Sequence, residues 1–306
     1  MRYFRQLFLM IMTGLSPLMG SMIDPLPLEM EVDEPKAALG KKLFFDPILS
    51  KDNTISCATC HNLENGGDDN LKFSFGIKGQ EGIINSPTVY NAVFNFRQFW
   101  DGRAKDLAEQ ALGPIENPVE MGNTFPNLIK TLYGTPYKKA FEAIYPDGIT
   151  KANIVNAIAE FEKALITPNA PFDRYLRGDQ KAITDDAKAG FSLFQKKGCI
   201  SCHHGINVGG NLYNKFGIME DAKSADFGRY NVTKRERDKF YFKVPSLRNI
   251  ARTTPYFHDG RTGDLTEAVK IMAMYQLGRS ITDEEVEKIV AFLISLTGEL
   301  PARAKQ

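Results

Sequence analysis

Apolar residues recur at helical spacing in several stretches of the chain. Asp33 precedes one such stretch and can cap a helix that carries Leu39 and Leu43 on one face. Thr184 precedes a second stretch of the same kind, which has Phe191 on its apolar stripe. Each stretch leads into a segment that contains two cysteines and a histidine. The pattern therefore predicts two amphipathic helices in equivalent positions.

Two further helices are predicted in the middle and at the end of the chain. Thr282 and Glu285 form a capping box, and apolar residues keep helical spacing after them until Gly298. Apolar residues keep the same spacing over 154–165, a stretch that ends ahead of a proline. The segment that follows, 167–171, is rich in proline and is typical of a connection between domains. We place a domain boundary near residue 167.

The two cysteine-containing segments are Cys-x-x-Cys-His motifs, and together they use every cysteine and two of the four histidines. They read Cys57-Ala58-Thr59-Cys60-His61 and Cys199-Ile200-Ser201-Cys202-His203. This is the attachment signal for c-type haem, in which the thiols form thioethers with the porphyrin and the histidine ligates the iron. A Cys₄ zinc site has only about 15–20 residues between its pairs. Thioredoxin-like redox pairs do not explain a histidine after each motif. We predict two covalently bound c-type haems.

The order of elements around each motif predicts the fold class. An amphipathic helix, a haem motif, a long loop and a closing helix occur twice, which is how a cytochrome c domain wraps its haem. The fold expected is mainly α, with two cytochrome c-like domains and long loops at 66–82 and 205–238. The N-terminal domain is predicted to cover residues 22–167 and the C-terminal domain residues 168–306.

Charge and the first residues of the chain suggest its compartment. A formal net charge of +1 gives no electrostatic indication of nucleic acid or of an anionic membrane as a partner. Arg2 and Arg5 precede a short apolar run and then small residues up to Ser21, which is the layout of a secretory signal over residues 1–21. The run is shorter than the roughly 20 apolar residues that span a bilayer. We expect export to the periplasm without stable membrane insertion.

The far side of each iron decides what each haem can do. Once His61 and His203 are used, only His204 and His258 remain, and neither lies in the first half of the chain. The first haem is therefore not expected to have two histidine ligands from its own domain, and an open iron face lets an exogenous molecule bind. For the second haem, Met272 lies on an apolar helical stripe. Taken alone, such a methionine belongs more often to a core than to a ligand set.

Several other segments resemble those of the bacterial dihaem cytochrome c peroxidases, and the resemblance runs from about Leu39 to Gly298. These segments are Leu43-Phe44-Phe45-Asp46-Pro47, Asn85-Ser86-Pro87-Thr88, Phe99-Trp100-Asp101-Gly102-Arg103, Asn117-Pro118-Val119-Glu120-Met121-Gly122, Pro171-Phe172-Asp173, Val244-Pro245-Ser246-Leu247-Arg248-Asn249 and Pro255-Tyr256-Phe257-His258-Asp259-Gly260.

The resemblance implies different roles for the two haems. It implies a low-potential peroxidatic haem in the N-terminal domain, ligated by His61, and a high-potential haem in the C-terminal domain, ligated by His203 and Met272. The substrate implied is hydrogen peroxide, and the electron donor is a small periplasmic cytochrome c or a cupredoxin. Members of the family are commonly homodimers.

The resemblance also implies further site residues. Gln110, Pro114 and Glu120 match the distal pocket of the peroxidatic haem. Trp100 matches a tryptophan between the haems, and His258 matches a histidine close to the electron-transfer haem. Asn85 matches an inter-domain calcium site with backbone oxygens near Thr253 and Pro255. A carboxylate over the haem can carry a proton between the peroxide oxygens, and a neighbouring amide can orient the peroxide. Without the resemblance, Glu120 reads as a helix-start carboxylate, Trp100 as packing and Asn85 as a turn residue.

One departure from the family pattern bears on the resting state. Many members have a histidine in the loop after the first haem motif, which ligates the peroxidatic iron until the other haem is reduced. Here that position is Ile77, which cannot ligate iron. We therefore hypothesise that the first haem is open or water-bound in the oxidised protein.

Two other functions stay open at this point. One is a dihaem protein that only transfers electrons. The other is a related dihaem enzyme that oxidises tryptophans of a partner protein and uses a tyrosine on its second haem, a role for which Tyr275 is close to Met272 in the sequence.

Overall fold

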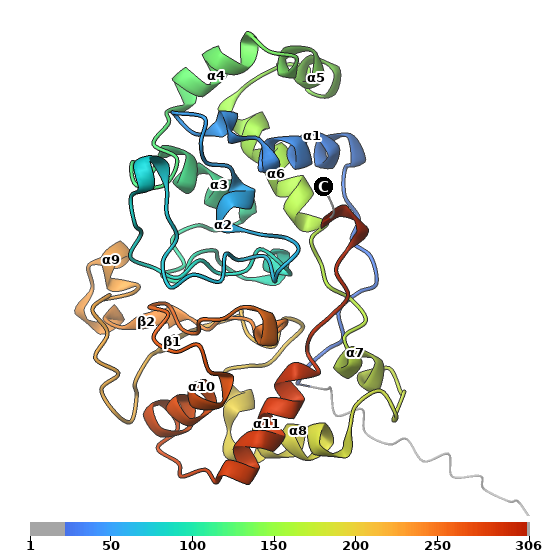
Figure 1. Ribbon diagram of the computed structural model, residues 1–306, viewed down its shortest axis with the longest axis vertical. Coiled ribbons are helices and arrows are strands. Elements are labelled where there is room, and N and C mark those ends of the chain that lie inside the picture. Colours follow the sequence, from blue (N-terminus) through green and yellow to red (C-terminus); the bar gives the residue numbers. More distant parts are fainter. Residues whose placement is uncertain (1–21, 305–306) are drawn as a thin grey trace, which may run out of the picture.

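The computed structural model describes residues 22–304, so the predicted secretory signal over residues 1–21 lies outside the described residues. The described chain is mainly helical and forms two stacked halves (Figure 1). Its helices are α1 (Glu34–Phe45), α2 (Cys57–Cys60), α3 (Leu107–Glu116), α4 (Phe125–Tyr133), α5 (Tyr137–Ile144), α6 (Lys151–Lys163), α7 (Pro171–Leu176), α8 (Asp185–Lys197), α9 (Tyr230–Thr233), α10 (Leu265–Ile271) and α11 (Asp283–Ile294). Two short strands, β1 (Tyr213–Lys215) and β2 (Tyr241–Lys243), pair antiparallel.

The helices predicted from apolar spacing begin at their predicted caps. The Asp33 carboxylate accepts a hydrogen bond from a first-turn amide of α1, and the Thr184 hydroxyl does the same for α8. Thr282 and Glu285 form the predicted capping box at the start of α11. This last helix ends at Ile294, a few residues short of the predicted glycine stop. Local sequence therefore sets where these helices begin.

Each half is built on one close helix crossing, and each crossing depends on a glycine. Gly40 of α1 lies against α6, where an added Cβ would be 1.8 Å from the Ala157 carbonyl oxygen. Gly190 of α8 lies against α11, where an added Cβ would be 1.8 Å from the Lys288 carbonyl oxygen. Both glycines are followed four positions later by a buried phenylalanine. The repeat of the haem motifs thus extends to the packing of the helices that frame them.

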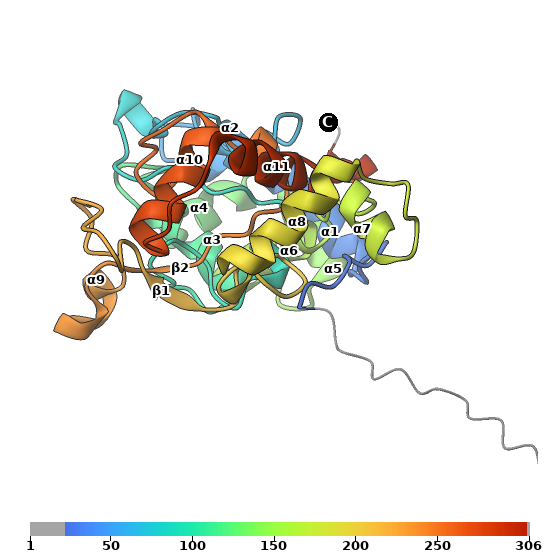
Figure 2. The ribbon, with the colours of Figure 1, turned by 90° about the horizontal axis from the view of Figure 1, so that it is seen from below.

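The two halves have separate apolar cores. The N-terminal core joins α1 with α3, α4, α5 and α6. The C-terminal core joins α7, α8 and α11, and Figure 2 views this half from below, with α8 and α11 crossing. The long segment 205–238, predicted to be a loop, contains β1 and α9 as well as irregular backbone, which corrects that expectation. Its strand pairs with β2, a partner distant in the sequence that local pattern does not reveal.

Both ends of the described chain cross to the opposite half. Near the N-terminus, Ile23 packs in the C-terminal core, and the Leu26 amide donates to the Asp173 carboxylate at 3.3 Å. Near the other end, Leu300 and Ala304 pack in an apolar cluster of the N-terminal half, beside α1 in Figure 1. The halves are therefore held together by both termini as well as by the connection between α6 and α7.

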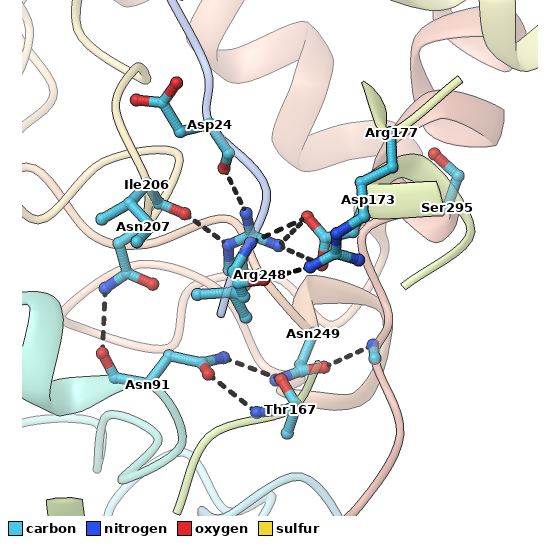
Figure 3. Close-up of polar contacts among 12 residues, drawn as sticks. Asp24, Asn91, Thr167, Asp173, Arg177, Ile206, Asn207, Arg248, Asn249 and Ser295 are labelled. Carbon is cyan, nitrogen blue, oxygen red and sulfur yellow. Dashed lines mark hydrogen bonds and ion pairs between the residues drawn. The ribbon is translucent and has the colours of Figure 1, made fainter. Parts of the chain in front are cut away.

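The predicted boundary residue, Thr167, is buried and hydrogen-bonded on both sides (Figure 3). Its hydroxyl accepts from the side-chain amide of Asn91 at 2.8 Å and from that of Asn249 at 2.9 Å. Its own amide donates to Asn91 Oδ1 at 2.9 Å. One short segment thus bonds simultaneously to an N-terminal and a C-terminal asparagine.

Within residues 22–304, no helix is long and apolar enough to cross a bilayer.

Candidate functional site

The first haem motif lines one pocket, here named the N-terminal pocket, with both cysteines and its histidine. α2 carries Cys57 and Cys60, and His61 follows directly at its C-cap. His61 Nδ1 lies 3.1 Å from the Gly67 carbonyl oxygen, which can only accept, so Nδ1 carries the proton. Burial lowers the pKa of His61, which keeps the imidazole neutral. The basic Nε2 is then the nitrogen available to a metal.

The chemistry of the cysteines fits covalent haem attachment. Neither Cys57 nor Cys60 is in a disulfide. Burial raises the pKa of Cys60 to about 11 and also raises that of Cys57, so both remain neutral thiols. Two thiols and a neutral imidazole that share one pocket are the donor set that a c-type haem requires.

Helix α3 contributes two further residues to the N-terminal pocket. Gln110 and Pro114 both line it, and their four-residue spacing places them on one face of the helix. Asp106 caps the helix and accepts from the Glu109 amide at 2.8 Å. Because proline has no amide hydrogen, the Gln110 carbonyl receives no helical bond from position 114.

Glu120 reaches the same pocket from a turn that folds back on α3. The Met121 amide donates to the Pro114 carbonyl at 3.1 Å, and the Glu120 amide donates to the Asn117 carbonyl at 3.1 Å. The Asn117 side chain donates to Glu120 Oε1 at 2.6 Å. Glu120 lies ahead of α4, which begins at Phe125, so the alternative interpretation as a helix-start carboxylate is wrong.

Opposing influences act on the Glu120 carboxyl. Burial raises its pKa, while the hydrogen bond from Asn117 and the positive charge of Arg103 act to lower it. A carboxyl in this environment is suited to accept and return a proton.

The loop around Ile77 is bonded to the Glu120 turn. The Ile77 amide donates to the Glu120 carbonyl at 2.8 Å, and the Gln80 side chain donates to the Pro118 carbonyl at 3.0 Å. The Ile77 side chain is buried against Gly122, where an added Cβ would lie 2.3 Å from Ile77 Cδ1. Ile77 is not among the residues that line the N-terminal pocket.

The second haem motif lines a separate pocket, here named the C-terminal pocket, through Cys199, Cys202 and His203. Both cysteines are free thiols, and burial lowers the pKa of His203 to about 4, so its imidazole is neutral. Met272 lines the same pocket, whereas Tyr275 does not. The donor set therefore fits a c-type haem with a thioether available as a further ligand.

The helix that carries Met272 changes geometry at that residue. α10 ends at Ile271 and continues as a π-helical turn over Met272–Gln276. π-Helical turns are rare in proteins, but those that occur are often found at functional sites. The apolar spacing in the sequence predicted a regular helix here and did not reveal the π-helical turn.

Trp100 borders both pockets. Its indole Nε1 donates to the Asn85 carbonyl at 2.9 Å, and its ring meets the His258 ring edge-on at 6.1 Å between centroids. His258 lines the C-terminal pocket, stacks on Phe242 at 4.1 Å, and has its Nε2 2.8 Å from the Ser224 hydroxyl. The matched tryptophan and histidine are thus neighbours at the contact between the two halves.

The residues of the predicted calcium site are also brought together. Asn85, Thr253 and Pro255 all line the C-terminal pocket. The Asn85 side-chain nitrogen donates to the Leu71 carbonyl at 2.9 Å, which orients the amide oxygen away from that bond. Among residues 22–304, no group of three or more His, Cys, Asp or Glu side chains is arranged to hold a metal. The calcium site stays a prediction.

Sequence reasoning missed three polar residues at these pockets. Asn117 orients Glu120, as described above. Glu162 is 5% exposed, lines the N-terminal pocket and has a buried Oε2 with no hydrogen-bond partner among residues 22–304, and burial raises its pKa to about 8. Lys243 is 6% exposed and lines the C-terminal pocket. No local signal marks Glu162 and Lys243, because a charged residue that follows an aromatic one in the sequence is common on exposed surfaces.

The chain is similar to known di-haem proteins over most of its length. A family model described as di-haem cytochrome c peroxidase matches residues 34–181, and a cytochrome c model matches residues 187–297. Cytochrome c peroxidase Ccp of Escherichia coli (strain K12) is 50% identical over 283 residues, which cover 90% of this chain and 61% of that protein. Cytochrome c551 peroxidase of Nitrosomonas europaea is 48% identical over 283 residues, which cover 91% of this chain and 85% of that protein.

The fold is also similar to that of a solved structure. The crystal structure of a MauG-like protein associated with microbial copper homeostasis has a TM-score of 0.79 to this chain. The match has 25% sequence identity and covers 90% of this chain and 93% of that one. The similarity therefore extends over both halves of the molecule.

Proposed function

Because the chain belongs to the di-haem cytochrome c peroxidase family, we propose that it reduces hydrogen peroxide to water at its N-terminal haem site. Each peroxide takes up two electrons and two protons and yields two water molecules. The observation that carries the proposal is that Glu120 and Gln110 share a pocket with Cys57, Cys60 and His61. A protein that only transfers electrons has no need of a carboxyl and an amide on the open side of a haem.

The residues of the N-terminal pocket act on the peroxide and its protons. The haem iron, when bound, supplies the site at which peroxide binds and is reduced. A Glu120 oxygen accepts the proton of one peroxide oxygen and delivers it to the other peroxide oxygen, which leaves as water. The Gln110 side-chain amide donates a hydrogen bond that orients the peroxide. The bond from His61 Nδ1 to the Gly67 carbonyl keeps the proximal imidazole in one orientation and makes Nε2 more basic.

Electrons enter through the C-terminal site. His203 and Met272 supply an imidazole and a thioether, and thioether ligation favours the reduced iron and a high potential. Trp100 borders both pockets and lies on the route between them. The donor is a small cytochrome c or a cupredoxin, the compartment is the periplasm, and Asn85 with the backbone of Thr253 and Pro255 binds one calcium ion between the halves.

A haem held by Cys57, Cys60 and His61 would keep one face free for peroxide in the oxidised protein. Position 77 offers an isoleucine, and its loop is bonded to the Glu120 turn through backbone and side-chain hydrogen bonds. These bonds hold the turn that carries Glu120 at the pocket, and they do not require prior reduction of the other haem.

A comparison of two glutamate variants tests the proposal. Glu120→Gln keeps the shape of the side chain but removes its acid–base function, so peroxide turnover with reduced cytochrome c should fall by about 10²- to 10⁴-fold. Glu116→Gln is the matched control, because Glu116 lies at the end of α3, just before the turn that carries Glu120, and pairs with Lys151 at 3.3 Å on the surface.

Haem content of both variants is measured alongside turnover. Equal turnover in both variants would contradict the role of Glu120. A wild-type protein that is fully reduced by its donor but does not consume peroxide would instead be an electron-transfer protein.

A further inference from the structure

Lys243 carries a buried positive charge that no described residue neutralises. It is 6% exposed and lies at the end of β2. Among residues 22–304, no hydrogen bond or ion pair involves its ammonium group, and burial alone acts on its pKa, lowering it to about 8. The side chain lines the C-terminal pocket.

The other buried basic side chain, Arg248, shows how this protein neutralises an internal charge. Figure 3 shows its guanidinium between Asp173 and two backbone carbonyls. It donates to both Asp173 oxygens at 3.0 and 3.1 Å, to the Ile206 carbonyl at 2.6 Å and to the Asp24 carbonyl at 3.0 Å. Arg248 is therefore fully paired within the protein, whereas Lys243 is not.

An unpaired buried ammonium is costly, so a partner must come from whatever fills the pocket. An isolated charge that is removed from water loses its hydration, which is strongly unfavourable even after the protein relaxes. A pocket lining that is largely apolar around Lys243 offers no compensation. The porphyrin of a c-type haem is itself apolar apart from two propionate carboxylates. These carboxylates are the one anionic feature of the expected occupant.

The other basic residues at this pocket do not compete for the same role. Lys197 is already paired with Glu285 at 2.8 Å. Lys215 and Arg279 are exposed and have water as an alternative partner. Of the lysines and arginines in this lining, Lys243 is the one that is buried and has no ion pair or side-chain hydrogen bond within residues 22–304.

The backbone holds Lys243 at the contact between the two pockets. Its amide donates to the Trp100 carbonyl at 2.7 Å, and Tyr213 of β1 pairs with it across the sheet. Trp100 is one of several residues that border both pockets, so the backbone of Lys243 is bonded directly to their shared boundary. The backbone of Lys243 is thus held on the side of the C-terminal pocket that borders the N-terminal half.

We propose that Lys243 binds a propionate carboxylate of the C-terminal haem and raises the reduction potential of that haem. A positive charge near the iron disfavours the ferric state, which carries one more positive charge than the ferrous state. Lys243 therefore acts with the Met272 thioether to make the C-terminal haem the better electron acceptor. The inference rests on haem attachment at Cys199 and Cys202 and deepens the proposed electron entry, but it does not depend on peroxide reduction.

A redox titration of the purified dihaem protein tests this role in the absence of peroxide. Replacing the lysine by an apolar side chain of similar length, Lys243→Met, should raise the ferric-to-ferrous ratio of the C-terminal haem about tenfold at a fixed potential, which is about 59 mV for one electron. Lys243→Arg keeps the charge and should stay close to the wild type. Lys239→Met is the matched control, because Lys239 is a surface residue of the same region that pairs with Glu236 at 2.7 Å.

The outcomes separate this role from a purely structural one. A Lys243→Met protein that keeps both haems with an unchanged ferric-to-ferrous ratio overturns the proposal. If the methionine variant does not retain haem, the arginine variant decides. Wild-type haem content and potential in Lys243→Arg support a charge-dependent contact, and loss of haem in both variants shows that shape rather than charge matters and overturns it. Failure of the peroxidase proposal would appear separately, as absent peroxide turnover with an intact Lys243 effect.

Discussion

Removing the Asn117 side chain should change the pH dependence of peroxide reduction. Asn117 Nδ2 donates to Glu120 Oε1 at 2.6 Å, and Asn117 Oδ1 accepts from the Val119 amide at 3.0 Å. The first bond stabilises the ionised carboxylate, which is the form that can accept a proton from peroxide. Asn117→Ala removes this stabilisation, so the pKa of Glu120 rises and the variant loses activity at pH values where the wild type is still active.

The size of the effect follows from the kind of bond that is lost. A hydrogen bond to a charged group contributes about 1.5–3 kcal/mol. Each pH unit corresponds to about 1.36 kcal/mol of preference between two protonation states. The acidic limb of kcat/KM against pH should therefore move upward by about one to two pH units. At a pH well above this limb, any loss of kcat/KM that remains relative to the wild type reports how much the bond also positions Glu120.

The assay is peroxide-dependent oxidation of a reduced cytochrome c, followed from acidic to alkaline pH, with haem content as a check on folding. Asn153→Ala is the matched control: Asn153 donates to an Asp147 oxygen at 2.7 Å in the same half, but does not line the N-terminal pocket. The control should leave the acidic limb in place. A folded Asn117→Ala protein whose limb coincides with that of the wild type would refute the assignment of the limb to Glu120.

Two further predictions concern stability and the resting state. Arg248→Met leaves the Asp173 carboxylate buried without its cation, so the free energy of unfolding in urea should fall by about 3–5 kcal/mol. The control Lys138→Met breaks a surface pair with Glu142 and should lower it by less than about 1 kcal/mol. Equal losses in the two variants would contradict the role of the buried pair. With reduced cytochrome c as the electron source, protein that starts fully oxidised should turn over peroxide without a separate pre-reduction step, because Ile77 cannot ligate the iron. An electron paramagnetic resonance spectrum with a dominant low-spin bis-histidine signal from the first haem would disprove that expectation.

Much of the helical framework could be predicted from local sequence. The caps at Asp33, Thr184 and Thr282 and the apolar stripes that follow them depend only on residues within a few positions of one another. A helix forms its hydrogen bonds within its own segment, so its start and its apolar face are encoded locally. The haem motifs are readable for the same reason, because two cysteines and a histidine on one short turn form a complete attachment signal.

The composition of the two pockets could be predicted only in part. Gln110 and Pro114 share a helical face, which spacing alone can indicate. That Glu120 enters the same pocket depends on a turn that bonds back to α3, and that Met272 begins a π-helical turn depends on the packing of that helix. These features came from the family resemblance or from the structure, since no periodic pattern encodes an irregular turn.

By itself, the sequence determined that the chain has two haem motifs, which helices frame them, and that the first half has no spare histidine to close its iron. Only the tertiary structure decided that Trp100 borders both pockets and that both ends of the described segment pack on the opposite half. It also decided that Arg248 has an acidic partner, while Lys243 has none within residues 22–304. The physical reason is range. Spacing and capping act over a few residues, whereas burial and charge pairing depend on groups brought together from distant parts of the chain, such as Asp173 and Arg248.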